Sequence, residues 1–174
     1  MERMDDARFL AWVAEGGIED RSRSAASLHL DVPKAVRRGR TWPAPADPGA
    51  LARWLDAIVR AASPDGLWWV RRRYGPGWFP CESGAPPSAE LERAASALHL
   101  PRGFTGALGF GSDDRDALLA LLRSYATWEW GMGEDLYLLP DDRSCIVLLC
   151  HDEEVHVTCA SPGRLDDFAA AMST

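Results

Sequence analysis

The sequence predicts an α+β fold, in which several helices, including one at the C-terminus, pack on a mostly antiparallel sheet. Two observations lead to this prediction. Amphipathic helical segments alternate with short apolar segments along most of the chain, and the region of about 135–159 contains three alternating segments separated by short polar turns. With 174 residues, of which 47% are hydrophobic, the chain is long enough and apolar enough to bury a core.

The first predicted element is a short amphipathic helix over residues 5–15. Phe9, Trp12 and Val13 lie on one face of this helix, at spacings of three and four residues. Gly16 and the glycine that follows it end the helix, because glycine readily adopts the left-handed conformation found at helix C-termini.

Residues 18–47 show neither helical nor strand periodicity. They contain a basic run from Lys34 to Arg40 and then a proline-rich stretch. Such a composition is typical of a linker, an arm or a mobile loop. We therefore expect residues 1–47 to form an N-terminal helix plus an irregular segment, and residues 48–174 to form a single α+β domain.

A strong helix is predicted to begin after Asp47, which occupies the N-cap position before Pro48. Its apolar side chains form one stripe: Leu51, Trp54, Leu55, Ile58 and Val59. A strand over 67–73 follows. In this strand Trp68, Val70 and Arg72 share one face, and Trp69, Arg71 and Arg73 share the other.

Three more elements are expected before the meander. They are a helix between Ser88 and Pro101, a glycine-containing strand over 104–110, and a helix that begins after Ser112 and extends through Tyr125. After the meander, a proline that follows Ser161 begins the C-terminal helix.

The meander consists of predicted strands at 136–139, 145–150 and 155–159, and its short polar turns suit hairpins. Pairing Cys150 with Val155, and Leu139 with Cys145, gives one consistent apolar face. That face comprises Leu136, Leu138, Ile146, Leu148, Cys150, Val155, Val157 and Cys159. The opposite face is also fairly apolar, so we expect another part of the chain to cover some of it.

Charge is distributed unevenly along the chain. Residues 1–80 contain 13 basic and 10 acidic residues, whereas residues 81–174 contain 6 and 16, which gives the overall net charge of −7. Overall acidity argues against broad nucleic-acid binding, because an acidic protein repels the phosphate backbone. The acidic second half can instead attract a basic partner protein and accelerate the encounter.

The sequence therefore favours a non-catalytic protein-binding module, because it has 8 tryptophans and no convergent set of catalytic residues. A concrete form is a bacterial immunity or inhibitor protein that blocks a basic partner protein. An alanine- and arginine-rich composition with one lysine is typical of a high-GC bacterial genome. We expect the partner face to comprise Trp128, Glu129, Trp130, Asp141, Asp142, Asp152, Glu153 and Glu154.

Two alternative functions stay open. The first is a small enzyme or ligand-binding domain, with a pocket near His156 between the meander and the segment over 68–79. Its lining residues would be Arg72, Cys81, Tyr137 and His156. The second is nucleic-acid binding through the basic first half, which would depend on the arginines at 71–73 and predicts a strong dependence of affinity on salt.

Cysteines and histidines in the meander superficially resemble a zinc motif: Cys145, Cys150, His151, His156 and Cys159. In the predicted strands, however, Cys145 and Cys150 point to opposite faces, and Cys150 and Cys159 are roughly 13 Å apart. Zinc needs its ligands within about 2.3 Å of one point. We therefore expect no metal and no cofactor.

The N-terminus is acidic and has no apolar signal core, and no apolar run approaches the length of a membrane span. We therefore expect a cytoplasmic protein without membrane association.

Overall fold

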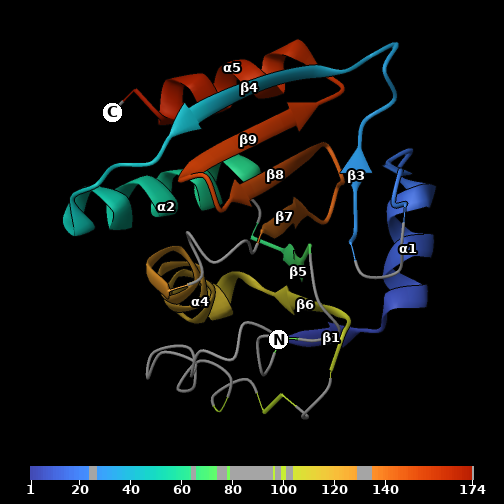
Figure 1. Cartoon of the computed structure of the whole chain (residues 1–174), viewed down its shortest axis with the longest axis horizontal. Helices are drawn as coiled ribbons and strands as arrows, with labels where there is room; N and C mark the ends of the chain where they lie inside the picture. The colour runs from blue at the N-terminus through green and yellow to red at the C-terminus, as the bar shows by residue number, and fades with distance from the viewer. Residues whose placement is uncertain are drawn as a thin grey trace.

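The structure, a computed structural model, describes residues 1–23, 27–63, 66–73, 78, 96, 99–100, 104–128 and 135–173. Over these residues the fold is α+β, as predicted: four α-helices accompany a seven-stranded antiparallel sheet and a two-stranded sheet (Figure 1). The helix expected between Ser88 and Pro101 falls almost entirely outside the described residues. No helix in the described part is long and apolar enough to cross a membrane.

The elements follow one another in an order close to the one predicted. They are β1 (Glu2–Met4), α1 (Asp6–Glu15), β2 (Glu19–Asp20), β3 (Leu30–Asp31), β4 (Arg38–Pro43), α2 (Pro48–Ala62), β5 (Trp68–Arg72), β6 (Ala107–Phe110), the 3-10 helix η1 (Ser112–Asp114), α4 (Arg115–Trp128), β7 (Leu136–Pro140), β8 (Cys145–Cys150), β9 (Glu154–Cys159) and α5 (Pro162–Ala171).

The large sheet has the strand order β1-β6-β5-β7-β8-β9-β4, and every neighbouring pair is antiparallel. Both edge strands come from the first 47 residues, so the sheet is built from both sides of the boundary expected at residue 47. The expectation of irregular structure over 18–47 is wrong for β2, β3 and β4. Edge strands such as β4 carry arginine and proline rather than a regular apolar pattern, because these residues discourage pairing with other chains.

Helices α1 and α2 begin after aspartates that accept an unpaired amide of the first turn. Asp47 Oδ1 accepts a hydrogen bond of 2.7 Å from the Ala50 amide, as its predicted N-cap role requires. Asp114 accepts from the Gly111 amide at 3.2 Å and forms an ion pair of 2.7 Å with the amino group of Met1. These two contacts lower the pKa of Asp114, and they attach the N-terminus beside the start of α4.

The register within the meander is shifted by one residue at both hairpins. Cys150 pairs with Glu154 rather than with Val155, and Leu138 pairs with Val147 rather than with Ile146. The loop between β8 and β9 has three residues and places Glu153 at φ 59°, the left-handed conformation that closes such loops. A shift of one residue exchanges the two faces of a strand.

The predicted apolar face is therefore wrong for β8. Even-numbered β8 residues lie on the same face as Tyr137, whereas the odd-numbered ones face the larger core. The helices α2, α4 and α5 cover the face of the sheet that belongs to the larger core, called the three-helix face below. From the meander it comprises Leu136, Leu138, Cys145, Val147, Leu149, Val155, Val157 and Cys159. Figure 1 shows these helices on one side of the sheet and α1 on the other.

The second face of the sheet, called the α1 face below, is covered only in part. Phe9 and Val13 of α1 pack with Trp69, Tyr137 and other buried side chains to form a smaller core. The expectation that some of this face is covered is thus confirmed. The part that lies over β8 and β9 toward the β4 edge is not covered by α1, and it forms the candidate site.

Candidate functional site

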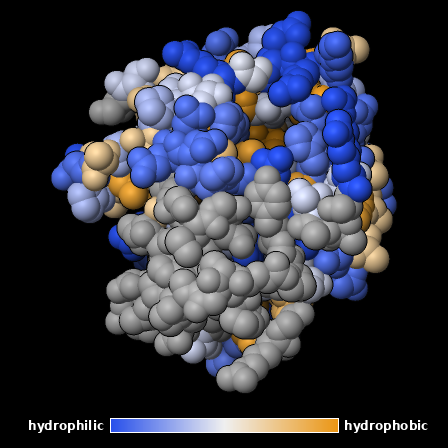
Figure 2. Space-filling model, in the orientation of Figure 1, coloured by the Kyte–Doolittle hydropathy of each residue, from blue (hydrophilic) through white to orange (hydrophobic). Residues whose placement is uncertain are grey.

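A groove lies on the α1 face between β3 and the edge formed by β9 and β4. It consists of two adjoining hollows of about 230 and 420 Å³, which share Arg37, His156 and Thr158. Figure 2 shows hydrophobic atoms at the bottom of a hollow flanked by hydrophilic residues. The groove is half open to solvent, which is typical of a binding surface rather than of an enclosed cavity.

The floor of the groove is mainly apolar, and the meander register creates it. Ile146, Leu148 and Cys150 point into the groove because β8 presents its even-numbered residues on this face. Tyr137 lies beside them, and its hydroxyl accepts a hydrogen bond of 3.2 Å from the Leu30 amide. Tyr137 therefore joins the floor to the β3 wall.

The β3 wall is held by a buried carboxylate that two arginines share. Asp31 is only 5% exposed. One of its oxygens lies 3.1 Å from Arg37 Nη1 and 3.2 Å from Arg21 Nη1. Arg21 also pairs with Glu19 at 2.6 Å, so the two arginines are balanced by two carboxylates.

A further arginine, Arg73, lines the groove beside His29. Arg73 Nη1 is 2.7 Å from Asp135, and Arg73 Nη2 is 3.2 Å from His29 Nδ1. Burial and the nearby Arg73 charge lower the pKa of His29. His29 is therefore neutral at pH 7, and its Nδ1 accepts a hydrogen bond from the guanidinium.

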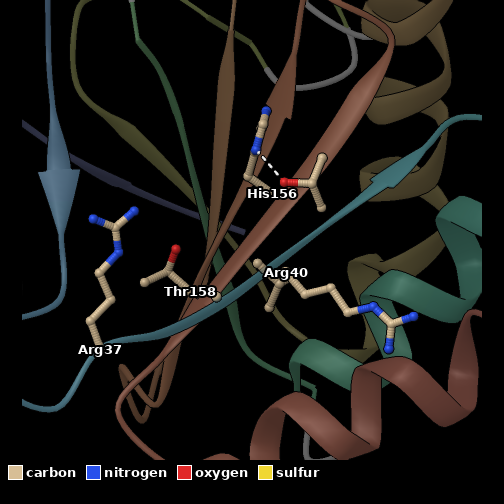
Figure 3. Close-up of a pocket in the computed structure, with 7 residues that line it drawn as sticks. Arg37, Arg40, His156 and Thr158 are labelled. Carbon is tan, nitrogen blue, oxygen red and sulfur yellow. Dashed lines mark hydrogen bonds between the residues drawn. The ribbon is translucent and has the colours of Figure 1, made fainter.

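Along the outer rim, a hydroxyl, an imidazole and a carboxylate follow one another. Thr41 Oγ1 lies 2.8 Å from His156 Nδ1 (Figure 3). His156 Nε2 lies 3.5 Å from Glu154 Oε2. The order resembles that of a hydrolytic triad, but the side chains of His156 and Glu154 are more than one third exposed, at 37% and 42%. Such triads act in desolvated sites, so this row serves as a hydrogen-bonding rim.

Cys150 is the thiol in the groove floor, and it is not an activated nucleophile. Burial, together with the nearby carboxylates, raises its pKa to about 11. A thiol with this pKa is almost entirely protonated at pH 7, and only the thiolate is a strong nucleophile.

The structure separates the residues expected to line the alternative pocket. Tyr137 and His156 line the same groove. Arg72 pairs with Leu136 and lies on the three-helix face, where it is 1% exposed. Cys81 lies outside the described residues.

The acidic residues of the expected partner face do not form one patch. Asp141 and Asp142 lie in the turn before β8, whereas Asp152, Glu153 and Glu154 follow its other end. The length of β8 therefore separates the two groups. Trp128 ends α4, but its side chain, together with Glu129 and Trp130, lies outside the described residues.

Arg71 and Arg72 are buried and taken up by internal contacts, whereas Arg73 pairs with Asp135 and lines the groove. Arg71 is 8% exposed and its Nε donates to Asp6 at 2.8 Å, and Arg72 is buried. Burial lowers the pKa of Arg71, although the Asp6 charge opposes this shift. These side chains do not form a basic surface for a phosphate backbone.

Sequence reasoning did not assign Asp31 or Thr41 to any site. Asp31 belongs to the two-residue strand β3 and Thr41 to the edge strand β4, and neither strand has an apolar periodicity. The pairing of β4 with β9 brings Thr41 beside His156. A signal was present in β4, where Arg38, Arg40 and Trp42 alternate with smaller residues, as expected for a strand with two different faces.

No protein-family model matches the chain, and comparisons with curated proteins and with solved structures give no significant match.

Proposed function

We propose that this protein is a non-enzymatic binding protein whose groove takes a small ligand with an anionic group and a short apolar part. The observation that supports the proposal is the combination of an apolar floor with a rim that carries Arg37 and Arg73. Ligand sites commonly pair an apolar lining with a few polar groups that orient the ligand. The anionic group is a carboxylate or a phosphate, since both match the planar fork of arginine.

The arginines of the groove are paired with carboxylates but stay accessible to an anion. Arg73 pairs with Asp135, and Arg21 pairs with both Glu19 and Asp31. The Arg37 side chain is 50% exposed, so it can move onto a ligand while Arg21 keeps Asp31 paired. Arg40 points away from Arg37 and lies over Trp42, so it makes no part of this argument (Figure 3).

The floor accounts for the apolar part of the ligand. Ile146 and Leu148 lie next to each other on the α1 face, between the two charged rims. Contact with apolar surface contributes about 25 cal/mol per Å². A half-open groove buries only one side of a ligand, so we expect affinities between about 10 µM and 1 mM.

The proposal develops the ligand-binding alternative without its catalytic step. Both groups of acidic residues lie at opposite ends of β8, so a partner protein would have to extend along the strand to contact both. A basic partner protein therefore stays a prediction. We infer a cytoplasmic protein, which the three free cysteines of the described part support, because thiols persist in reducing compartments. A bacterial origin stays a prediction from composition.

Three probes test the proposal: phenyl phosphate, benzoate and the neutral benzyl alcohol, each titrated into the isotope-labelled protein and followed by amide chemical shifts. We expect saturable shifts at residues 29–31, 37 and 156–158 with one or both anions, and none with the alcohol. Arg37→Gln is expected to weaken anion binding about tenfold or more, because a charge-assisted hydrogen bond is worth about 1.5–3 kcal/mol.

Arg60→Gln is the matched control. Arg60 is 64% exposed, lies on α2 and pairs with Asp56 on the other side of the sheet. It should leave the affinity unchanged. Equal binding of the neutral alcohol, equal loss in both variants, or no saturable shift at millimolar concentrations would each contradict the proposed function.

A further inference from the structure

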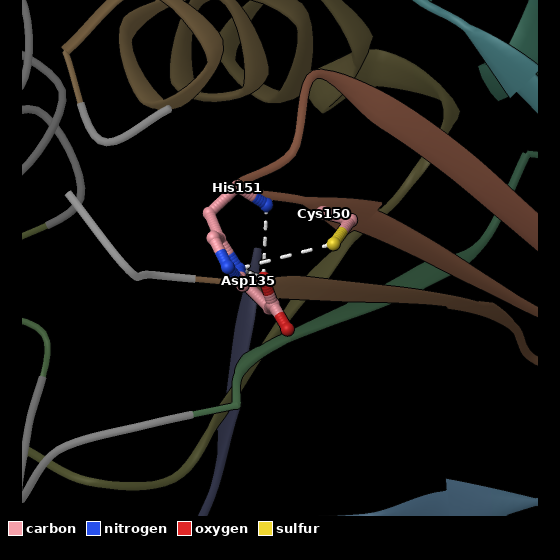
Figure 4. Close-up of side chains that lie close together, drawn as sticks. All are labelled: Asp135, Cys150 and His151. Atoms are coloured by element: carbon pink, nitrogen blue, oxygen red, sulfur yellow. Dashed lines mark hydrogen bonds and ion pairs between the residues drawn. The ribbon is translucent and has the colours of Figure 1, made fainter. Parts of the chain in front are cut away.

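Three different metal-binding side chains meet where β7 begins and β8 ends. Asp135 directly precedes β7, Cys150 ends β8, and His151 begins the following turn. Because Leu136 pairs with Leu149, the antiparallel ladder brings Asp135 beside Cys150 and His151 (Figure 4). One oxygen, one sulfur and one nitrogen of these residues all lie within 4.8 Å of one another.

We propose that Asp135, Cys150 and His151 bind a zinc ion, or a divalent transition metal of similar chemistry. The site goes beyond the proposed anion groove, with which it shares Cys150 and Arg73, and Arg37 takes no part in it. It also differs from the cysteine–histidine pattern considered in the sequence, because Cys145 and Cys159 lie on the three-helix face.

Distances within the cluster are close to those of a tetrahedral site. His151 Nδ1 is 3.8 Å from Cys150 Sγ and 2.7 Å from Asp135 Oδ1. At zinc bond lengths of about 2.0–2.3 Å, tetrahedral geometry separates nitrogen from sulfur by about 3.6 Å and from oxygen by about 3.3 Å. Movements of less than about 1 Å would thus produce the required arrangement.

The donor set selects the metal. A thiolate, an imidazole and a carboxylate suit zinc, whereas magnesium and calcium prefer oxygen ligands alone. A fourth position remains for water or for Asp152. Its Oδ2 lies 3.6 Å from Cys150 Sγ and its Oδ1 lies 3.6 Å from His151 Nε2, on a side chain that is 69% exposed.

Neighbouring groups orient the ligands from outside. Asp135 is fully buried, and its second oxygen, Oδ2, accepts a hydrogen bond of 2.7 Å from Arg73. The backbone amide of His151 donates to Oδ1 at 2.9 Å. Hydrogen-bonded carboxylates of this kind are a regular feature around protein metal ligands, because they hold the coordinating oxygen in place.

Charge and protons balance on binding. The metal displaces the proton of the Cys150 thiol, and the His151 proton that now points at Asp135 moves to Nε2, so that Nδ1 offers its lone pair. Two positive charges on the ion and one on Arg73 then face one negative charge each on Cys150, Asp135 and Asp152. The local cluster is neutral, as a partly buried site requires.

Cobalt(II) is the first probe, added to the full chain after treatment with a chelator. We expect one equivalent to bind with a dissociation constant below about 10 µM, and a thiolate-to-cobalt charge-transfer band to appear. Zinc chloride should displace the cobalt and remove the band. Cys150→Ser is expected to lose the band and to weaken zinc binding at least tenfold, whereas Cys145→Ser, on the other face, should keep both.

His151→Gln keeps the test decisive if Cys150→Ser fails to fold. The His151 side chain is 36% exposed in a turn, so the variant should fold, and it should weaken zinc binding about 10–100-fold. Circular dichroism checks that each variant is folded. The site is overturned if the wild-type chain binds no stoichiometric zinc, or if both variants retain the affinity and the charge-transfer band.

Discussion

Arg164 of α5 connects three separate elements, and its removal should lower stability clearly. Its Nη2 donates to the carbonyl oxygens of Ala61 at 3.0 Å and Ala62 at 2.7 Å, at the C-terminal end of α2. Its Nε donates to Ser144 Oγ in the β7–β8 turn at 3.1 Å. We therefore choose Arg164→Met, which retains an apolar stem over Phe168 but removes every one of these donors.

The magnitude follows from the charged donors. A hydrogen bond that involves a charged group contributes about 1.5–3 kcal/mol, and a cation at a helix C-terminus adds about 0.3–1 kcal/mol. The Arg164 side chain is 20% exposed, so water can replace part of what is lost at the two α2 carbonyls. We therefore expect the free energy of unfolding to fall by about 2–3 kcal/mol.

Urea unfolding at pH 7.5, followed by circular dichroism, measures this change. A loss of this size lowers Tm by about 5–10 °C in a chain of this length. Arg60→Met is the control, since Arg60 makes only an exposed ion pair within α2, and it should cost less than about 0.5 kcal/mol. If the two variants are equally stable, Arg164 does not connect α5 to α2 in the way described.

Three further predictions concern backbone geometry and charge. Gly106→Ala places a methyl group against the Met4 carbonyl oxygen, so it should push β1 away from the sheet. We expect the free energy of unfolding in urea to fall by about 1–3 kcal/mol, and no loss would contradict this close approach. Glu153→Gly removes the strain of a side chain at φ 59°, so it should raise the free energy of unfolding by up to about 1 kcal/mol and Tm slightly. A lower Tm would count against the turn described. Burial and the Arg73 charge lower the pKa of His29 below its usual 6.5, so protonation of His29 at low pH favours the unfolded chain. Between pH 7.5 and 5, the free energy of unfolding measured in urea should therefore fall more for the wild type than for His29→Asn. Equal decreases would argue against this shift.

Local signals in the sequence predicted most of the helices. Asp47 before Pro48 and the apolar stripe after them correctly located α2, and the alternation of Trp68, Val70 and Arg72 correctly assigned the faces of β5. Each of these features depends on residues within one or two turns of one another. A side chain that caps its own helix needs no other part of the chain, so its role can be inferred from the sequence.

Edge strands and register could not be inferred in this way. β4 carries Arg38, Arg40 and Pro43, and its short alternation without an apolar face does not by itself separate a strand from an irregular arm. The predicted and the observed registers of the meander both satisfy the apolar alternation, because β8 is apolar on both faces. The observed register goes with left-handed conformations in the two hairpin loops, at Arg143 and at Glu153.

The sequence by itself thus determined the fold class, the four described α-helices and the three strands of the meander, since these depend on periodicity and on neighbouring residues. The tertiary structure decided the faces of β8, the groove and the cluster of Asp135, Cys150 and His151. The groove and the cluster join residues that strand pairing brings together, such as Thr41 with His156 and Asp135 with Cys150. A shift of one residue along β8 would turn Cys150 and Ile146 to the opposite face and remove both sites. The register, which is a property of the whole sheet, therefore determines the chemistry of this surface.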